Sequence, residues 1–154
     1  MKLAFGCDHA GFPLRETVLA ACAAAGCEVL DLGTFSIEPV DYPDVARAVG
    51  ERLQRGQATR GILLCGSGVG VSIAANKMFG VRAAVCHDAY SAHQGVEHDN
   101  MNVLTVGARV VGPALASELV RAFLGATYTA EERHARRFAK VQQLEAELSG
   151  QTRS

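Results

Sequence analysis

The chain has 154 residues, and its 15 Lys and Arg against 16 Asp and Glu give a formal net charge of −1. No overall field therefore draws it to nucleic acid or to a membrane surface, and no apolar run is long enough to cross a membrane. The five cysteines are an odd number without paired metal spacing, which favours reduced thiols and a cytoplasmic location. We expect one domain over residues 1–150, followed by a disordered tail at 151–154.

Short apolar runs alternate along the chain with segments of helical periodicity. The apolar runs predict strands at residues 2–7, 27–32, 61–65, 81–86 and 103–106. The periodic segments predict helices at residues 13–25, 41–56, 89–97, 113–124 and 130–148. A glycine-rich turn after Cys65 leads into one more short helix.

This alternation requires a parallel sheet with helices on both faces. We therefore predict an α/β fold, namely a three-layer α/β/α Rossmann-like sandwich with a five-stranded parallel sheet and an extended C-terminal helix. Such folds bind their ligands where the strands end. Polar groups follow four of the predicted strands: Asp8-His9, Cys65 with its glycines, His87-Asp88 and Arg109.

The turn that follows Cys65 is the most informative stretch. Gly66, Gly68 and Gly70 permit backbone conformations in which several N–H groups point at one anion. A thiol beside a helix N-terminus can act as a thiolate at neutral pH. The segment therefore offers a base or nucleophile next to a site for negative charge. The alternative is that Cys65 is one more small buried side chain.

Three familiar glycine motifs do not fit this turn. A P-loop would place Lys, and a cysteine phosphatase loop would place Arg, where this chain has Val71. The dinucleotide fingerprint spaces its glycines differently, and no acidic residue is evident at the end of the next strand.

Two polar groups near the predicted strand ends allow a structural and a functional interpretation. Asp8-His9 would suit a simple turn, but it shares an edge with Cys65, which favours membership of the site. His98, followed by Asp99, could equally be a solvated helix end. His87-Asp88 is better explained as the start of a helix.

The C-terminal helix combines an apolar stripe with a basic start. Thr129 stands three residues before Glu132, a capping-box pattern. We predict a buried stripe formed by Phe138, Val141, Leu144 and Leu148.

Arg133 and Arg137 lie one turn apart on the same face of this helix. Cations at a helix N-terminus oppose the helix dipole unless an anion is bound. The pair is either a phosphate clamp, which paired guanidinium groups suit, or a solvated face balanced by neighbouring glutamates.

Together these segments resemble ribose-5-phosphate isomerase B, a family grouped with galactose-6-phosphate and allose-6-phosphate isomerases. The resemblance covers nearly the whole chain in order. It rests on Phe5-Gly6-Cys7-Asp8-His9-Ala10-Gly11, Asp41-Tyr42-Pro43, Cys65-Gly66-Ser67-Gly68-Val69-Gly70, Ala74-Ala75-Asn76-Lys77, Tyr90-Ser91-Ala92, Asn102-Val103-Leu104 and Gly107-Ala108-Arg109-Val110-Val111-Gly112.

The resemblance implies an aldose–ketose isomerase that interconverts ribose 5-phosphate and ribulose 5-phosphate through a cis-enediol(ate). It implies no metal and no cofactor. It also implies active sites shared across a homodimer, whose dimers could pair into tetramers.

The resemblance further implies the role of each site residue. Cys65 would move the proton between C2 and C1, and Val71 supports this, because one branch of the family has its catalytic Glu there. His98 would open the furanose ring by accepting or donating the ring-oxygen proton. Ser67 would assist, and Asp8 would bind sugar hydroxyls or help at the ring. The implied substrate-binding residues are His9, Tyr42, Gly66, Gly68, Val69, Gly70, Asp99, Arg109, Arg133, His134 and Arg137.

One departure from the family concerns the sugar. Many members have Asn after the ring-opening His, whereas this chain has Asp99, and a carboxylate cannot donate to a substrate oxygen. Two alternatives stay open. The same chemistry could act on allose 6-phosphate, galactose 6-phosphate or a tetrose phosphate, or the chain could be a non-catalytic sugar-phosphate-binding protein.

Overall fold

The structure is a computed structural model that describes residues 1–150; the tail expected at 151–154 lies outside the described residues. The strands are β1 (Lys2–Cys7), β2 (Glu28–Asp31), β3 (Arg60–Cys65), β4 (Ala83–Val85) and β5 (Val103–Gly107). The helices are α1 (Arg15–Ala24), α2 (Tyr42–Gln54), α3 (Val69–Ala75), α4 (Ala89–Asp99), α5 (Pro113–Gly125) and α6 (Glu132–Ser149). A single 3-10 turn, η1 (Phe12–Leu14), precedes α1.

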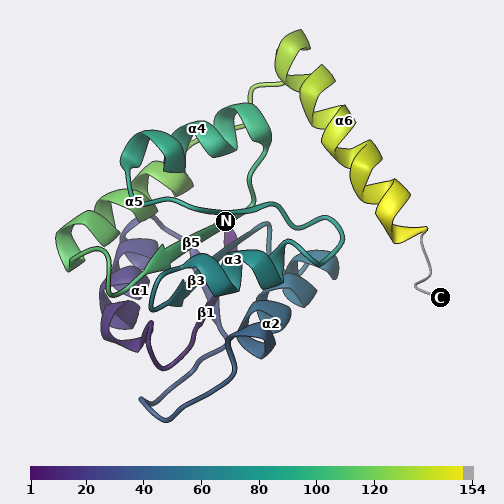
Figure 1. The fold of residues 1–154 in the computed structure, drawn as a ribbon. Coiled ribbons are helices and arrows are strands. Elements are labelled where there is room, and N and C mark those ends of the chain that lie inside the picture. Colours follow the sequence, from purple (N-terminus) through teal and green to yellow (C-terminus); the bar gives the residue numbers. More distant parts are fainter. Residues whose placement is uncertain (151–154) are drawn as a thin grey trace.

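The five strands form one parallel sheet in the order β2-β1-β3-β5-β4 (Figure 1). Leu64 pairs with Cys7, and Cys65 pairs with Gly107, so the exits of β1, β3 and β5 lie side by side. The predicted fold class is thus confirmed, and the strand order places the glycine turn in the middle of the sheet.

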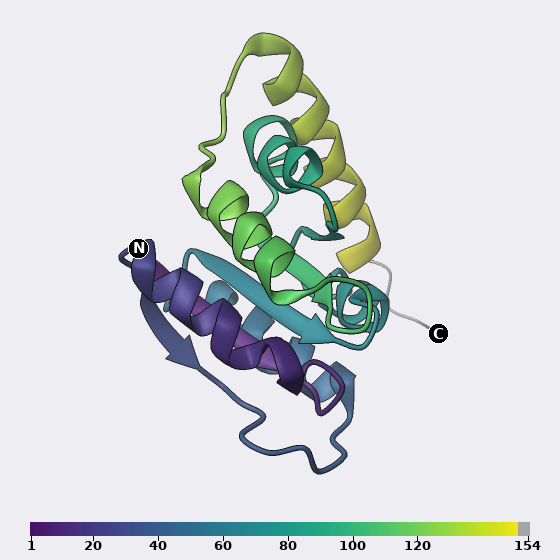
Figure 2. The same cartoon turned by 90° about the vertical axis from the view of Figure 1, so that its left-hand side faces the viewer.

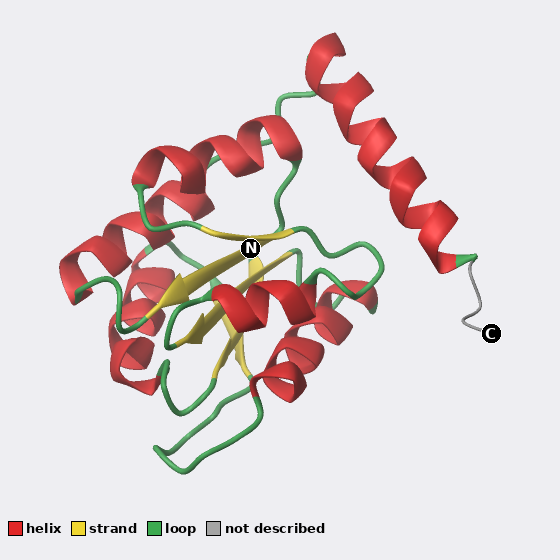
Figure 3. Ribbon diagram, viewed as in Figure 1, coloured by secondary structure: helices red, strands yellow, loops and turns green. Residues whose placement is uncertain are grey.

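Two separate apolar cores lie on the two faces of the sheet. On one face Phe5, Ile62 and Leu104 pack against α1, α4 and α5, and Figure 2 shows α1 and α5 covering it. On the other face Leu63 and Cys65 pack against residues of α2 and α3. Figure 3 shows helices, in red, on both sides of the yellow strands. Alternate side chains of a strand point to opposite faces, so a strand buried on both faces is apolar throughout.

The start of β4 is later than the sequence predicts. The predicted strand covered 81–86, but the backbone N–H of Val81 donates to Met78 in a turn, and that of Arg82 donates to the side chain of Asn102. These bonds take the place of strand-to-strand hydrogen bonds at Val81 and Arg82, and the strand therefore begins at Ala83.

The capping box predicted at the start of α6 is wrong. The residue that precedes the helix is Glu131, and no side chain caps it. Thr129 instead donates both its backbone N–H and its hydroxyl to the carbonyl of Glu97 in α4, at 2.9 and 3.1 Å. Thr129 therefore ties the segment before α6 to the last turns of α4.

The prediction that α6 has a buried apolar stripe is also wrong for a single copy of the chain. Val141, Leu144 and Leu148 are 51%, 61% and 68% exposed, and Phe138 is only half-buried. Among the other elements, α6 contacts chiefly α4, and it stands at the side of the molecule (Figure 1). The periodic pattern correctly marks an apolar face, but within residues 1–150 of one copy nothing covers it.

No helix within the described range has the length and apolar composition needed to cross a membrane.

Candidate active site

The exit of β3 forms a tight loop around the sulfur of Cys65. Gly68 has φ +80°, a left-handed conformation that favours glycine. Its backbone N–H donates to Sγ of Cys65 at 3.0 Å, while its carbonyl accepts from the hydroxyl of Thr105 at 2.9 Å. Cys65 is 5% exposed. The loop thus aims a peptide N–H at the sulfur, which accepts that hydrogen bond.

The exits of β1 and β5 flank this loop. Asp8 is 6% exposed, its backbone N–H donates to Leu64, and its Oδ1 accepts from Gly11 N–H at 2.8 Å. Arg109 donates its backbone N–H to the carbonyl of Gly66 at 3.0 Å. A Cβ atom on Gly66 would lie 3.5 Å from Nη1 of Arg109. Asp8 and Arg109 therefore follow the two strands that flank β3, and each is bonded to its exit.

His9 and Tyr42 complete the group at this edge. Nδ1 of His9 accepts from the backbone N–H of Val40 at 3.2 Å, so a neutral ring carries its hydrogen on Nε2. The Tyr42 ring packs over the loop, since a Cβ atom on Gly70 would lie 3.0 Å from its Cε2. We call Asp8, His9, Tyr42, residues 65–70 and Arg109 the carboxyl-edge cluster.

His87 supports this cluster, a role that was not predicted from the sequence. Its Nε2 accepts from the backbone N–H of Gly107 at 2.9 Å, and Gly107 packs directly against the backbone of Ser67. Asp88 caps α4 by accepting from Ser91 N–H, a bond that lowers the pKa of its carboxyl. The helix start predicted at His87-Asp88 is confirmed, and only the imidazole has the additional contact.

The remaining predicted site residues gather elsewhere, between the end of α4 and the start of α6. The rings of His98 and His134 stack with centroids 4.0 Å apart. Burial, aided by the nearby charges of His98, Arg133 and Arg137, lowers the pKa of His134. Its ring is 4% exposed, whereas both arginines are exposed. We call His98, Asp99, Arg133, His134 and Arg137 the amino-edge cluster.

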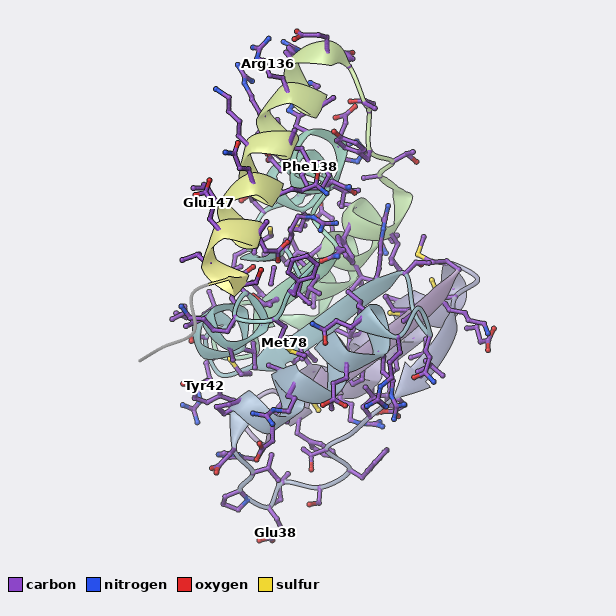
Figure 4. All side chains as sticks on the ribbon, turned by 90° about the vertical axis from the view of Figure 1, so that its right-hand side faces the viewer. Glu38, Tyr42, Met78, Arg136, Phe138 and Glu147 are labelled. Carbon is purple, nitrogen blue, oxygen red and sulfur yellow. The ribbon has the colours of Figure 1, made fainter. Side chains whose placement is uncertain are left out.

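The two clusters lie at opposite ends of the parallel strands. The carboxyl-edge cluster lies where the strands end, and the amino-edge cluster lies near the beginning of β5. α4 ends at Asp99, immediately before β5 begins at Val103, whereas Cys65 pairs with Gly107 at the other end of β5. At about 3.3 Å per residue, the length of β5 alone separates them by roughly 15 Å. In Figure 4, Arg136 near the start of α6 lies far from Tyr42 of the carboxyl-edge cluster. Within one chain the structure therefore does not bring His98, Asp99, Arg133, His134 or Arg137 to Cys65.

Side chains around the amino-edge cluster hold α4 and α6 together. Arg82 donates to the carbonyl of Asn100 at 2.6 Å, and its guanidinium lies 4.9 Å from the centroid of the Phe138 ring. Glu145 accepts from the backbone N–H of Gly80 at 2.6 Å. These contacts fix the position of the basic start of α6 relative to His98.

Two further thiols lie near the exits of β1 and β4. Burial raises the pKa of both Cys7 and Cys86 to about 11, so they stay protonated at neutral pH. Neither sulfur receives a hydrogen bond like the one that Cys65 receives from Gly68.

A cavity of about 680 Å³ lies between α6, α4 and the segment from α3 to β4. Its lining includes Asp99, Val141 and Leu148 but not Cys65. It coincides with the uncovered side of α6 rather than with the carboxyl-edge cluster. Among residues 1–150, no three or more His, Cys, Asp or Glu side chains are grouped to hold a metal ion.

Residues 3–141 match the family model described as Ribose/Galactose Isomerase. The chain is 47% identical over 144 residues to ribose-5-phosphate isomerase B of Escherichia coli, covering 94% of this chain and 96% of that protein. It is 41% identical over 132 residues to D-erythrulose-4-phosphate isomerase of Pectobacterium atrosepticum, covering 83% and 85%.

A solved structure of ribose-5-phosphate isomerase B from Clostridium thermocellum has the same fold, with a TM-score of 0.92 and 42% identity. The likeness covers 96% of this chain and 99% of that one.

Proposed function

The chain belongs to the ribose/galactose isomerase family and is a sugar-phosphate isomerase, and from that premise we propose that it interconverts ribose 5-phosphate and ribulose 5-phosphate. Because the chain belongs to this family, it is an enzyme rather than a non-catalytic sugar-phosphate-binding protein. The likeness to two proteins named ribose-5-phosphate isomerase B supports this choice of sugar.

The hydrogen bond from Gly68 N–H to the sulfur of Cys65 carries the proposed chemistry. Abstraction of a proton beside a carbonyl needs a base in reach and donors aimed at the oxygen that gains charge. Cys65 as a thiolate takes the proton from C2 of the open-chain aldose. The electron pair forms the C1–C2 double bond and moves the carbonyl pair to O1, which the loop N–H groups stabilise. The hydroxyl proton of O2 then passes to O1, and the thiol returns its proton to C1 to form the ketose.

The buried carboxylate of Asp8 and the hydroxyl of Ser67 lie within the same cluster. Asp8 binds the sugar hydroxyls and assists at the ring, and Ser67 supports the enediolate. His9 presents Nε2–H, and Arg109 presents its guanidinium, to anionic parts of the substrate.

The substrate needs both clusters, and one chain holds them apart. We therefore infer a homodimer in which the amino-edge cluster of one copy faces the carboxyl-edge cluster of the other. His98 then acts at the ring oxygen, while Arg133 and Arg137 bind the phosphate. The exposed Val141, Leu144 and Leu148 support this assembly, since an apolar helix face calls for a covering partner.

A substrate panel tests the choice of sugar. Initial rates with ribose 5-phosphate, allose 6-phosphate, galactose 6-phosphate and erythrose 4-phosphate should give the highest kcat/KM for ribose 5-phosphate. The likeness to an erythrulose-4-phosphate isomerase makes erythrose 4-phosphate the second candidate. A higher kcat/KM for this tetrose phosphate would make it the proposed substrate in place of ribose 5-phosphate. Undiminished rates in excess EDTA are expected for a metal-independent reaction.

Cys65→Ser tests the base. The substitution should lower kcat by roughly a thousandfold, because the hydroxyl is a far weaker acid than the thiol, while ribose 5-phosphate binding persists. Cys27→Ser is the matched control, since Cys27 is a half-buried thiol at the start of β2, and it should keep wild-type kcat. Wild-type turnover in Cys65→Ser would remove Cys65 from the mechanism.

A further inference from the structure

Gln94 lies one helical turn before His98 on α4 and contacts two members of the amino-edge cluster at once. Its Nε2 lies 3.0 Å from Nδ1 of His98 and 3.2 Å from Oδ2 of Asp99. Nothing in the sequence indicated a role for Gln94, and the family resemblance implied that Asp99 binds the substrate. The structure shows Asp99 bonded to Gln94 instead.

The carboxylate of Asp99 determines which way the amide of Gln94 faces. The oxygen and nitrogen of an amide are told apart by their hydrogen-bond partners, and a carboxylate accepts but cannot donate. If the amide were reversed, its oxygen would face the carboxylate oxygen at 3.2 Å, an acceptor against an acceptor. The NH₂ group therefore faces Asp99, and the same nitrogen has a second hydrogen for His98.

The orientation of Gln94 in turn determines the state of His98. An NH₂ group can only donate, so Nδ1 of His98 must be the unprotonated acceptor. A neutral imidazole carries one hydrogen, which is then on Nε2.

The other groups around the ring agree with this assignment. Oε2 of Glu97 lies 3.7 Å from Nε2, the side on which a hydrogen is attracted to a carboxylate. The same oxygen lies 3.7 Å from Nε2 of His93. From α6, the ring of His134 is stacked on His98, with Glu131 3.8 Å from Nε2 of His134. Among the described residues, Gln94 supplies the one hydrogen-bond partner of Nδ1 of His98.

We propose that Gln94 and Asp99 are positioning residues that hold His98 in the Nε2–H tautomer, so that it acts on the ring oxygen as a hydrogen-bond donor that keeps its proton. This inference rests on the proposed role of His98 in ring opening. In that step the bond between C1 and the ring oxygen breaks, and its electron pair goes to the ring oxygen. The ring oxygen gains the proton that leaves the C1 hydroxyl, while Nε2–H stabilises the developing charge.

The proposal also explains the departure from Asn that the sequence shows at position 99. Asn at this position could present either its oxygen or its NH₂ to Gln94, and it would permit both amide orientations. A carboxylate permits only one. Asp99 therefore contributes through Gln94 rather than through the sugar.

The tautomer can be read directly from the ¹⁵N chemical shifts of the imidazole in labelled protein, with the His98 signal identified by its loss in His98→Asn. We expect Nε2 of His98 to be protonated in the wild type at a pH where the ring is neutral. Gln94→Glu changes the donor into an isosteric acceptor and should move the hydrogen to Nδ1. Gln94→Met should give a mixture of the two forms.

The activity of the same variants separates this inference from the proposed function. Gln94→Glu should lower kcat/KM for ribose 5-phosphate by roughly a hundredfold, the usual effect of losing one such donor. The same substitution should lower kcat/KM for erythrose 4-phosphate by less than about threefold. O4 of this sugar is phosphorylated, so no furanose ring forms and none has to be opened. Gln57→Glu is the control, with the same charge change at an exposed amide bonded to Arg52.

Protonated Nδ1 in the wild type would overturn the inference whatever the activities are. If the tautomer changes in Gln94→Glu but the rate with ribose 5-phosphate does not, Gln94 still sets the tautomer of His98, and the ring-opening role of His98 fails instead.

Discussion

Gly68 donates its backbone N–H to the sulfur of Cys65 at 3.0 Å while its own carbonyl is held by Thr105. The glycine reaches this position with φ +80° and packs against the backbone of β5. The thiol and its peptide donor are therefore fixed to each other by the sheet rather than by a flexible loop.

Gly68→Ala should disturb this arrangement. The new Cβ would lie 3.0 Å from the carbonyl carbon of Val106 and 3.1 Å from the nitrogen of Gly107, both backbone atoms. We expect a loss of about 1–2 kcal/mol in the free energy of unfolding from the left-handed conformation alone. We also expect a fall in kcat of roughly tenfold to a hundredfold as the donor moves.

Gly56→Ala is the matched control for Gly68→Ala. Gly56 has φ +67° and an added Cβ would meet nothing within 4 Å, so this variant has the conformational cost without the collision. Denaturant unfolding and steady-state kinetics on both variants separate the two effects. Wild-type kcat in Gly68→Ala would show that the loop donor does not matter.

Sharing of the site across a dimer predicts complementation between inactive variants. Cys65→Ala and His98→Asn should each be inactive as homodimers. Unfolding and refolding them together should restore about a quarter of wild-type turnover, because half of the dimers are mixed and each mixed dimer has one intact site. No recovery in a mixture that forms mixed dimers would contradict the shared site.

Leu144→Lys should break the dimer. Leu144 is 61% exposed in one chain, and a charge in the middle of the apolar face of α6 would have to be desolvated on assembly. We expect a monomer in analytical ultracentrifugation and a loss of activity of at least about tenfold. Gln143→Lys places the same charge on the neighbouring exposed position and should stay dimeric.

His134 should make the protein less stable in acid. Burial and neighbouring cations lower the pKa of His134 below 6.5, its ordinary value in the unfolded chain. The unfolded state then binds more protons, so the stabilisation is present above pH 6.5 and is lost as the pH falls through the folded value. Urea unfolding between pH 5 and pH 8, at one protein concentration, measures this loss in the free energy of unfolding.

The variant His134→Gln should show a weaker dependence on pH over this range. Equal stability of the wild type at both ends of the range would contradict the assignment.

Cys22 should make the folded protein less stable at alkaline pH. Burial, with a contribution from Cys27, raises the pKa of the Cys22 thiol from 9.0 to about 12. The folded state then retains a proton that the unfolded state releases, so stability falls as the pH rises above 9. Each pKa unit corresponds to about 1.4 kcal/mol. Cys22→Ala should reduce the slope of unfolding free energy against pH between 9 and 10.5 by up to about one proton.

The local pattern of the sequence was enough to predict most of the carboxyl-edge cluster, whereas Tyr42 was predicted only from the family resemblance. Apolar runs and helical periodicity predicted the alternation, and right-handed crossovers place every strand exit of a parallel sheet at one edge. Cys65, Asp8 and Arg109 each follow a strand directly. Their position at one end of the sheet therefore follows from chain order, and the strand order places β1, β3 and β5 side by side.

The position of His98 was not predicted in this way, although a signal for it was present. His98 ends a helix that runs back across the sheet and stands a few residues before Val103, so it must lie at the opposite edge from Cys65. The contact between Gln94, His98 and Asp99 depends on rotamers at the end of α4 and leaves no pattern in the sequence.

Local order along the chain was sufficient to predict the α/β fold class and the glycine loop at Cys65, and it carries the family resemblance. The strand order, the distance between the two clusters and the exposure of the stripe on α6 became known from the three-dimensional arrangement. An apolar helix face has the same periodicity whether its own core or a second copy covers it, so the pattern on α6 could not distinguish the two cases.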